Sequence, residues 1–443
     1  MSRTFCPIPG IVASHICALY RYAALPFMLL LTCCNGPVKK DIPGTNTVTI
    51  ALNAPIPLPA PEFQRLHAAA TAWFDSALRR NFNGSMLVAK NGNIIFEVYN
   101  GNAHVGSTDA ITDSTAFHIA SVSKTFTAMA ILKLWQDGKL NIDDEFGKYF
   151  PAFNYPGITI RNLLSHRSGL PNYVYFMEDL GWDETIYITN EDVLNFMINR
   201  KAEIKNIALP GNRFNYCNTN YVLLALLIEK QSGKSYSDFL KESFFAPLDM
   251  SNTFVYNRSD SIEVTPSYDG RGGMIPFNYF DVVYGDKNIY STPKDLLKWD
   301  RALTSGVLFK ENTLAEAYAP YSNEKPGVRN YGLGWRMNIY PTGKKMIYHN
   351  GWWHGNNASF IRLLEDSATI IVLGNKYNPR IYHVNRLANL FGHYLDIKDS
   401  EEPEAVRTPP AAVKKRPAKA VRRSPAVKAK KTVVPVKKKT AKK

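Results

Sequence analysis

The pattern Ser-x-x-Lys is the first feature of this 443-residue sequence that could do chemistry. A serine hydroxyl attacks a carbonyl only when a base takes its proton and donors stabilise the resulting oxyanion. At the start of a helix, the i, i+3 spacing puts the lysine amine on the same face as the hydroxyl, and the free serine N–H can act as an oxyanion donor. The pattern occurs three times, at Ser121/Lys124, Ser291/Lys294 and Ser322/Lys325.

Sequence context selects the first copy. Ser121-Val122-Ser123-Lys124 opens a predicted amphipathic helix over 121–137 and follows an apolar lead-in over 117–120. The copy at Ser291 has proline at its third place, and the copy at Ser322 lies in a polar loop. Ser121 is therefore the predicted nucleophile, and Lys124 is its predicted partner.

Two further short motifs follow in chain order. Tyr216-Cys217-Asn218 comes directly before an apolar stretch over 221–231, which predicts a buried helix. His349-Asn350-Gly351 lies on a predicted strand, where a glycine suits the close approach of a substrate backbone. Each motif is common alone, since Tyr348-His349-Asn350 is a second Tyr-x-Asn. Three motifs in order, each in suitable context, are hard to obtain by chance.

These motifs carry a resemblance to a known family. The segment 117–129 (FHIASVSKTFTAM) resembles the nucleophile segment of class C β-lactamases and D,D-peptidases, which are penicillin-recognising serine hydrolases. The segments 163–171 and 285–303 are similar to other segments of that family. Tyr216-Cys217-Asn218 stands where the family has Tyr-x-Asn, and 349–351 stands where it has Lys-Thr-Gly or His-x-Gly.

The resemblance covers roughly residues 61–395 and implies both a fold and an activity. The implied fold is α/β (α+β), with an antiparallel sheet flanked by helices and an inserted, mostly helical subdomain. The implied activity is acyl-enzyme hydrolysis of an amide or ester, either a D-amino-acid peptide or a small ester. No cofactor is expected, and no cluster of His, Cys and carboxylates predicts a metal site.

The resemblance also implies a role for each motif residue. Ser121 attacks the acyl carbonyl, and Lys124 helps to take the hydroxyl proton. Tyr216 relays that proton to the leaving group and later activates water. His349 supplies a donor or partial charge beside Tyr216.

Four residues are implied in substrate binding. Asn218 hydrogen-bonds the substrate amide and Lys124, and the backbone N–H of Trp352 is the second oxyanion donor. Asn350 and Gly351 belong to the strand that the substrate approaches.

The third motif departs from the β-lactamase pattern. His349 replaces a lysine and Asn350 replaces a threonine, and in β-lactamases both of those residues help to hold the substrate carboxylate. Because imidazole carries less charge near neutral pH, we expect poor penicillin hydrolysis and a better fit to a peptidase, amidase or esterase. Two alternatives stay open: a true class C-type β-lactamase, and an inactive protein that binds penicillin or cell-wall peptides.

The elements that must position these residues are predicted from periodicity and turn residues. Strands at the two ends of the body should pair into one antiparallel sheet, with a helical middle as a second subdomain. The Asn91-Gly92 dipeptide between two apolar runs predicts a hairpin. The predicted elements are helices over 62–79 and 382–395 and strands over 86–89, 94–99, 345–349, 358–364 and 368–373.

Charge is concentrated at the C-terminus. The sequence has 53 Lys and Arg against 38 Asp and Glu, and 15 of the basic residues lie in 407–443, which has no acid. The rest of the chain is therefore neutral, which argues against a specific nucleic-acid partner. Residues 399–443, rich in Lys, Ala and Pro, predict a disordered tail that binds an anionic surface.

The N-terminus predicts export. Residues 1–34 read as a signal of lipoprotein type, because the apolar run 23–32 is too short to span a bilayer and ends at Cys33-Cys34. Cys34 is the predicted lipidation site, and the alternatives are an ordinary cleaved signal and a plain membrane anchor. Residues 35–60 would tether the hydrolase body, 61–398, to the membrane of the cell envelope or periplasm.

Overall fold

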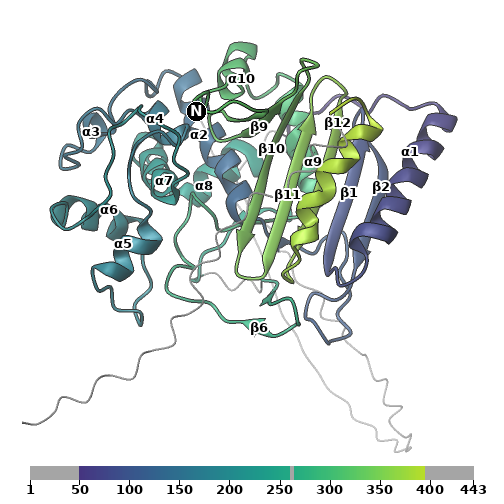
Figure 1. Ribbon diagram of the computed structural model, residues 1–443, viewed down its shortest axis with the longest axis horizontal. Coiled ribbons are helices and arrows are strands. Elements are labelled where there is room, and N and C mark those ends of the chain that lie inside the picture. The colour runs from purple at the N-terminus through teal and green to yellow at the C-terminus, as the bar shows by residue number, and fades with distance from the viewer. Residues whose placement is uncertain (1–48, 260–263, 395–443) are drawn as a thin grey trace, which may run out of the picture. The chain divides into compact units, whose positions relative to one another are not determined.

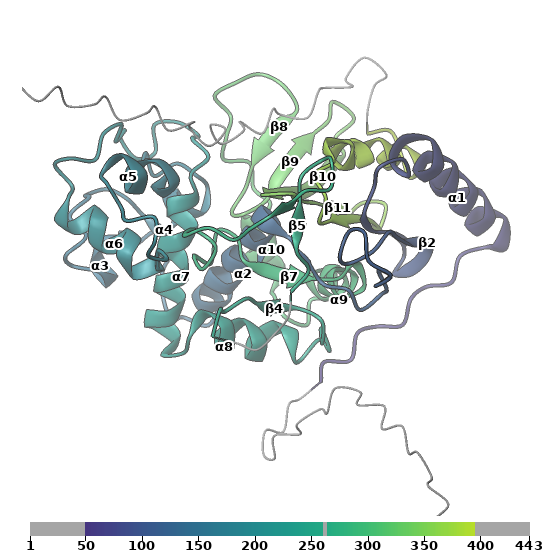
Figure 2. The ribbon, with the colours of Figure 1, turned by 90° about the horizontal axis from the view of Figure 1, so that it is seen from below.

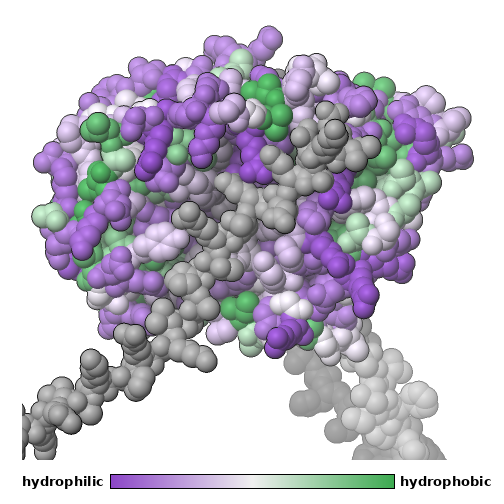
Figure 3. Space-filling view, viewed as in Figure 1, coloured by the Kyte–Doolittle hydropathy of each residue, from purple (hydrophilic) through white to green (hydrophobic). Residues whose placement is uncertain are grey.

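The computed structural model describes residues 49–259 and 264–394. The predicted signal, Cys34 and the basic tail lie outside these ranges. Within them, every helix is too short or too polar to cross a bilayer. The face of the body shown in Figure 3 is mostly hydrophilic, with small separate areas of hydrophobic residues.

A seven-stranded sheet organises the described part of the chain, with every neighbouring pair antiparallel. Its N-terminal strand β1 pairs with both β2 and the C-terminal strand β12, so the predicted pairing of the two ends of the body is confirmed. The sheet order is β2 (Asn93–Asn100), β1 (Gly84–Lys90), β12 (Ala368–Gly374), β11 (Asn356–Leu363), β10 (Lys345–Trp353), β9 (Arg336–Ile339) and β8 (Arg329–Tyr331).

The predicted hairpin between β1 and β2 is also confirmed. Asn91 has φ of 53° and Gly92 has φ of 77°, which is the pair of positive angles that a two-residue type I′ turn requires. Asparagine and glycine adopt these angles at low cost. The turn fixes the register in which Lys90 lies opposite Asn93.

Helices cover both faces of the sheet (Figure 1). One face is covered by the first and last helices of the described chain, α1 (Ala60–Trp73) and η4 (Pro379–Leu390). Helix α1 continues as one π-helical turn, η1 (Phe74–Leu78). Helices α2 (Ser123–Gln136) and α9 (Pro293–Thr304) pack on the other face. Each face thus has its own apolar cluster, and the predicted fold class is confirmed.

The middle of the chain forms the helical part beside the sheet (Figures 1 and 2). Its central helix α7 is buried along most of its length, as the apolar stretch predicted. Short strands and one helix complete the body: β3 (Phe117–His118), β4 (Phe254–Val255), β5 (Ser267–Tyr268), β6 (Met274–Ile275), β7 (Ile289–Ser291) and α10 (Glu311–Ala317). The helical part contains α3 (Phe146–Tyr149), α4 (Ile160–Leu164), α5 (Tyr173–Asp179), α6 (Asn190–Asn199), α7 (Asn218–Ser232), α8 (Tyr236–Leu240) and η3 (Lys241–Phe245).

Two expectations need correction. The closing helix, expected over 382–395, is the 3₁₀ helix η4, and it begins earlier because the Asn378 side chain accepts the Arg380 N–H and Pro379 suits the first helical position. Residues 50–56 of the tether expected over 35–60 contact the body, and residues 35–48 lie outside the described ranges. From Ile50 on, the chain is held against the body, since the Ile50 N–H donates to the Pro247 carbonyl at 2.7 Å and the Ile56 N–H donates to the Asn91 carbonyl at 3.1 Å.

Candidate active site

Ser121 lies on a strained turn at the entrance to α2. It belongs to the short 3₁₀ helix η2 (Ala120–Val122), which leads into α2 at Ser123. Ala120 has φ of 48°, a left-handed conformation that costs a non-glycine residue free energy. Such strain persists only where the surroundings impose it, and it presents Ser121 partly exposed while the following helix is buried.

Lys124 connects Ser121, the predicted nucleophile, to the segment at Asp286. Its side chain is completely buried, and its Nζ lies 3.0 Å from the Ser121 Oγ and 2.6 Å from the Asp286 carbonyl oxygen. The preceding Gly285 allows that approach, because a Cβ there would lie only 2.4 Å from the Tyr221 carbonyl oxygen of α7. The amine is therefore fixed within hydrogen-bonding distance of the hydroxyl, as the i, i+3 spacing predicted.

Tyr216 lies beside this pair. The Lys124 Nζ is 5.2 Å from the centroid of the Tyr216 ring, which is half-buried just before α7. Asn218 is the first residue of α7, and its Oδ1 is buried without a hydrogen-bond partner among the described residues. The structure thus brings Ser121, Lys124 and Tyr216 together and leaves the Asn218 amide oxygen able to accept a hydrogen bond.

Strand β10 packs closely against η2, the turn that carries Ser121. A Cβ added at Gly351 would lie 2.3 Å from the Ile119 carbonyl oxygen and 3.1 Å from the Ser121 nitrogen, so only glycine fits without displacing the turn. Within the described chain, β10 pairs with β9 only from Lys345 to Tyr348. Beyond Tyr348, the side of β10 that would face β9 is left to other contacts, and Gly351 lies against the turn that carries Ser121.

His349 has a different environment from the one expected. It does lie near Tyr216, with ring centroids 6.3 Å apart, but it is completely buried. Its Nε2 is 3.2 Å from the Tyr331 hydroxyl and its Nδ1 is 2.7 Å from the Asn350 carbonyl oxygen. Burial, with Arg336 and Lys124 nearby, holds the pKa of His349 well below its usual range. His349 is thus a neutral ring with both nitrogens engaged and not a free donor.

The side chains of Asn350 and Trp352 lie on the other face of the strand. Successive side chains alternate between the faces of a sheet, and Tyr348 packs with the cluster under α1 and η4. Asn350 shares that face and accepts a hydrogen bond from Ser359 at 2.9 Å, while the Trp352 ring lies 6.2 Å from that of Tyr377. The Asn350 side chain is therefore not a substrate contact, and the backbone N–H of Trp352 stays the predicted oxyanion donor.

Two functional candidates were not predicted from the sequence. The Arg336 guanidinium lies over the Tyr216 ring, 5.0 Å from its centroid, and Tyr331 contacts His349 as described above. Both residues lie on the short strands β8 and β9, which the periodicity did not indicate. The one available signal in the sequence was a single arginine shortly before the third motif. Single arginines are too common in sequences to identify a functional residue.

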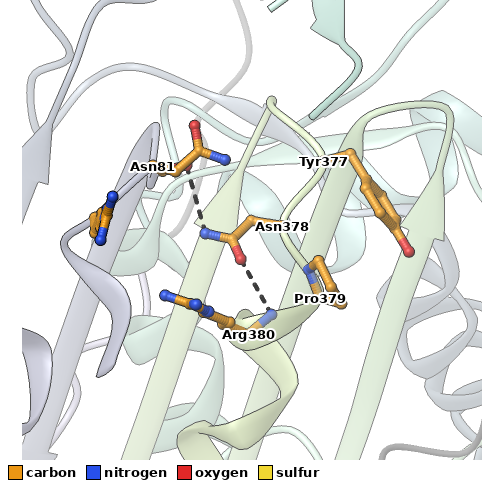
Figure 4. A pocket seen from close by; sticks show the side chains of 6 residues that line it. Asn81, Tyr377, Asn378, Pro379 and Arg380 are labelled. Carbon is orange, nitrogen blue, oxygen red and sulfur yellow. Dashed lines mark hydrogen bonds between the residues drawn. The ribbon is translucent and has the colours of Figure 1, made fainter. Parts of the chain in front are cut away.

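Other candidate features do not belong to this constellation. Ser291 is buried with its Oγ 2.8 Å from the Thr253 Oγ1, and Lys294 forms an ion pair with Asp113 at 2.9 Å. No group of three or more His, Cys, Asp or Glu side chains suited to a metal occurs among the described residues. A surface pocket of about 240 Å³ (Figure 4) contains none of the predicted catalytic residues; it is lined by Arg80, Asn81, Tyr377, Asn378, Pro379 and Arg380.

Known proteins share this architecture. Penicillin-binding protein 4* of Bacillus subtilis is 32% identical over 342 residues, which is 72% of this chain and 75% of that protein. The octameric penicillin-binding protein homologue of Pyrococcus abyssi superposes with a TM-score of 0.61 at 25% identity, over 74% of this chain and 77% of that one. The D-amino acid amidase of Ochrobactrum anthropi shares the fold, with a TM-score of 0.59 at 23% identity over 75% of this chain and 96% of that one.

The match to a protein family is equally extensive. The family described as Beta-lactamase matches residues 73–391, which include Ser121, Lys124, Tyr216 and His349. That range covers nearly all of the body that the structure describes. The chain therefore belongs to the β-lactamase family and is a serine hydrolase of that family.

Proposed function

We propose that this enzyme hydrolyses amide bonds of D-amino-acid peptides through an acyl-enzyme on Ser121. The observation that carries the proposal is the buried Lys124 amine 3.0 Å from the Ser121 Oγ, beside the Tyr216 ring. A serine becomes an effective nucleophile when a positioned base lies within hydrogen-bonding distance. The inactive alternative has less support, because Ser121, Lys124 and Tyr216 lie together as the reaction requires.

The proposed reaction has two stages. The Ser121 Oγ attacks the carbonyl carbon while its proton passes to Lys124 and Tyr216, and the oxyanion is held by the backbone N–H groups of Ser121 and Trp352. Tyr216 then delivers the proton to the departing amine as the C–N bond breaks. In the second stage, water attacks the ester, its proton passes to Tyr216, and Ser121 regains a proton as the acid product leaves.

Arg336 supports a substrate with a free C-terminal carboxylate. Its guanidinium over the Tyr216 ring is a fixed positive charge at the site, whereas the neutral, engaged His349 cannot supply one. Guanidinium groups bind carboxylates through two parallel hydrogen bonds. We place the carboxylate of the departing residue beside Arg336, which favours a carboxypeptidase-type substrate over a simple ester.

The substrate proposal is tested with matched peptides. We expect N-acyl-D-Ala-D-Ala to be cleaved about 10–100-fold more efficiently than its C-terminal amide, since a charged hydrogen bond contributes about 1.5–3 kcal/mol. R336Q should abolish that preference. R329Q, an exposed arginine on the adjacent strand β8, is the control and should retain it. An undiminished preference in R336Q would show that the carboxylate binds elsewhere.

The same residues support slow turnover of penicillins. A β-lactam also carries a carboxylate, but the third motif offers it neither a lysine nor a threonine, and the Asn350 side chain lies on the other face of β10. We therefore propose that penicillin acylates Ser121 and is released slowly. Rapid turnover of cephalosporins by the purified enzyme would favour the β-lactamase alternative.

We further propose that the enzyme works in the cell envelope, anchored through a lipid on Cys34. The support is the short apolar run before Cys33-Cys34 and the basic tail, which suits an anionic surface. Metabolic labelling with radioactive palmitate should mark the wild-type protein and not C34A. Equal labelling of both proteins, or of neither, would contradict the lipoprotein assignment.

A further inference from the structure

His166 holds the chain on both sides of Tyr216. The residue follows α4 and is completely buried. Its carbonyl oxygen accepts the N–H of Asn215 at 2.8 Å, and its Nδ1 accepts the N–H of Cys217 at 3.1 Å. The residues immediately before and after Tyr216 are thus bonded to one residue of another segment.

The imidazole also lies against the phenol itself. The ring centroids of His166 and Tyr216 are 4.3 Å apart, and the rings of Tyr221 and Tyr331 lie 5.0 Å and 4.8 Å from the imidazole. The imidazole is thus completely buried among three tyrosine rings. A displacement of the imidazole would therefore displace Tyr216 as well.

The protonation state of His166 suits this role. Because Nδ1 accepts a backbone N–H, the neutral ring carries its proton on Nε2. Burial, with Lys124, His349 and Arg336 adding positive charge nearby, lowers the pKa of His166 well below its usual range. A proton on Nδ1 would face the Cys217 N–H and break the bond, so the neutral ring keeps Tyr216 in place.

The backbone of His166 shows that its position is imposed. Its φ of 56° lies in the left-handed region, which a histidine adopts only at a cost. In this conformation the carbonyl and the side chain of one residue both reach the 215–217 segment. The strained backbone conformation of His166 therefore accompanies the two hydrogen bonds to the residues on either side of Tyr216.

We infer that His166 is the positioning residue for Tyr216, fixing the phenol through a hydrogen bond on each side and through ring contact behind it. This inference rests on the proposed function, in which Tyr216 relays the proton. Among the described residues no hydrogen bond joins His166 to Ser121, so we place its effect on the reaction through Tyr216. A substitution of the side chain can remove the Cys217 N–H bond, whereas the bond from the Asn215 N–H to the backbone carbonyl of residue 166 can remain.

Two substitutions distinguish the contribution of the Nδ1 hydrogen bond from the contribution of the ring contact with Tyr216. H166N keeps an acceptor close to the place of Nδ1 and tolerates the positive φ, whereas H166F keeps a ring and loses the acceptor. H166L replaces H166F if that variant does not fold. Y155F, which removes a buried hydrogen bond to the Met197 carbonyl in the helical part, is the control for a general loss of packing.

The first readout is kinetic. We expect H166F to lower kcat on N-acyl-D-Ala-D-Ala about 100-fold with KM within about threefold, since a displacement of about 1 Å costs that much in rate. H166N should stay within about tenfold of wild type, and Y155F should leave kcat unchanged. Equal losses in folded H166N and H166F, or none in H166F, would overturn the role of the Nδ1 acceptor.

The second readout needs no activity. 3-Fluorotyrosine at position 216 should give one sharp ¹⁹F resonance in wild type and H166N, and broadened or multiple resonances in H166F. An unchanged resonance in H166F would overturn the inference. If wild-type Ser121 is not labelled by a fluorophosphonate, the proposed function fails, and the resonance alone decides whether His166 positions Tyr216.

Discussion

Substitution of Gly351 by alanine tests the contact between β10 and the nucleophile turn. A Cβ at this position would lie 2.3 Å from the Ile119 carbonyl oxygen, and ordinary contact begins at 3.4 Å, so the two backbones must separate by about 1.1 Å. The obstructing atom belongs to the backbone, which cannot rotate aside as a side chain can. Because Ser121 lies two residues after Ile119, the displacement passes directly to the nucleophile.

The expected loss follows from that displacement. A misplacement of about 1 Å lowers the rate about 100-fold, and overpacking lowers the free energy of unfolding by about 1–3 kcal/mol. The assay is kcat/KM on a p-nitrophenyl ester, together with the rate at which a fluorophosphonate labels Ser121 and a thermal melt. G147A is the matched control, since a Cβ there meets the Phe153 carbonyl oxygen at an ordinary 3.4 Å. Labelling of folded G351A at the wild-type rate would show that the contact with β10 does not position Ser121.

Three further predictions concern single residues. K124M should lower kcat/KM on the ester about 1,000-fold because it removes the base, and a loss below tenfold in the steady-state assay would argue against that role. Burial lowers the pKa of His118 to about 3. Between pH 6.5 and 3 the unfolded state therefore binds more protons than the folded state. As the pH falls through this range, this residue lowers the free energy of unfolding by about 1.4 kcal/mol per pH unit. Guanidinium melts at pH 6.5 and 5.5 should show a smaller pH dependence in H118F, and an unchanged one would contradict this. D300A should lower the free energy of unfolding by about 3–5 kcal/mol, because it leaves the buried Arg362 guanidinium without its carboxylate; a melt that shows less than about 1 kcal/mol would count against a buried ion pair.

Local signals in the sequence were sufficient to predict the main strands and helices of the fold. Asn91-Gly92 permits few conformations other than a tight hairpin turn, and the structure has that turn. The apolar stretch before Gln231 could only be buried, and α7 is buried. Ser121 and Lys124 were selected because a helix begins at that point, and the Lys124 Nζ does lie 3.0 Å from the Ser121 Oγ across the junction of η2 and α2.

The remaining features depend on contacts between distant segments. Arg336 approaches Tyr216 only because β9 pairs with β10, and a four-residue strand leaves little periodicity to detect. The role of His166 is not visible in the sequence, since nothing local shows that residues 215–217 return to it. The direction of the Asn350 side chain could have been predicted, because a period of two places Asn350 and Gly351 on opposite faces of one strand.

Intact-protein mass spectrometry can show whether Ser121 is an activated nucleophile. The full chain and its S121A variant are incubated with a fluorophosphonate and, separately, with a penicillin. We predict that wild type gains one adduct from each probe, that the penicillin adduct persists, and that S121A gains neither. A folded wild-type protein that gains no adduct, or an S121A variant that is labelled equally, would contradict the account.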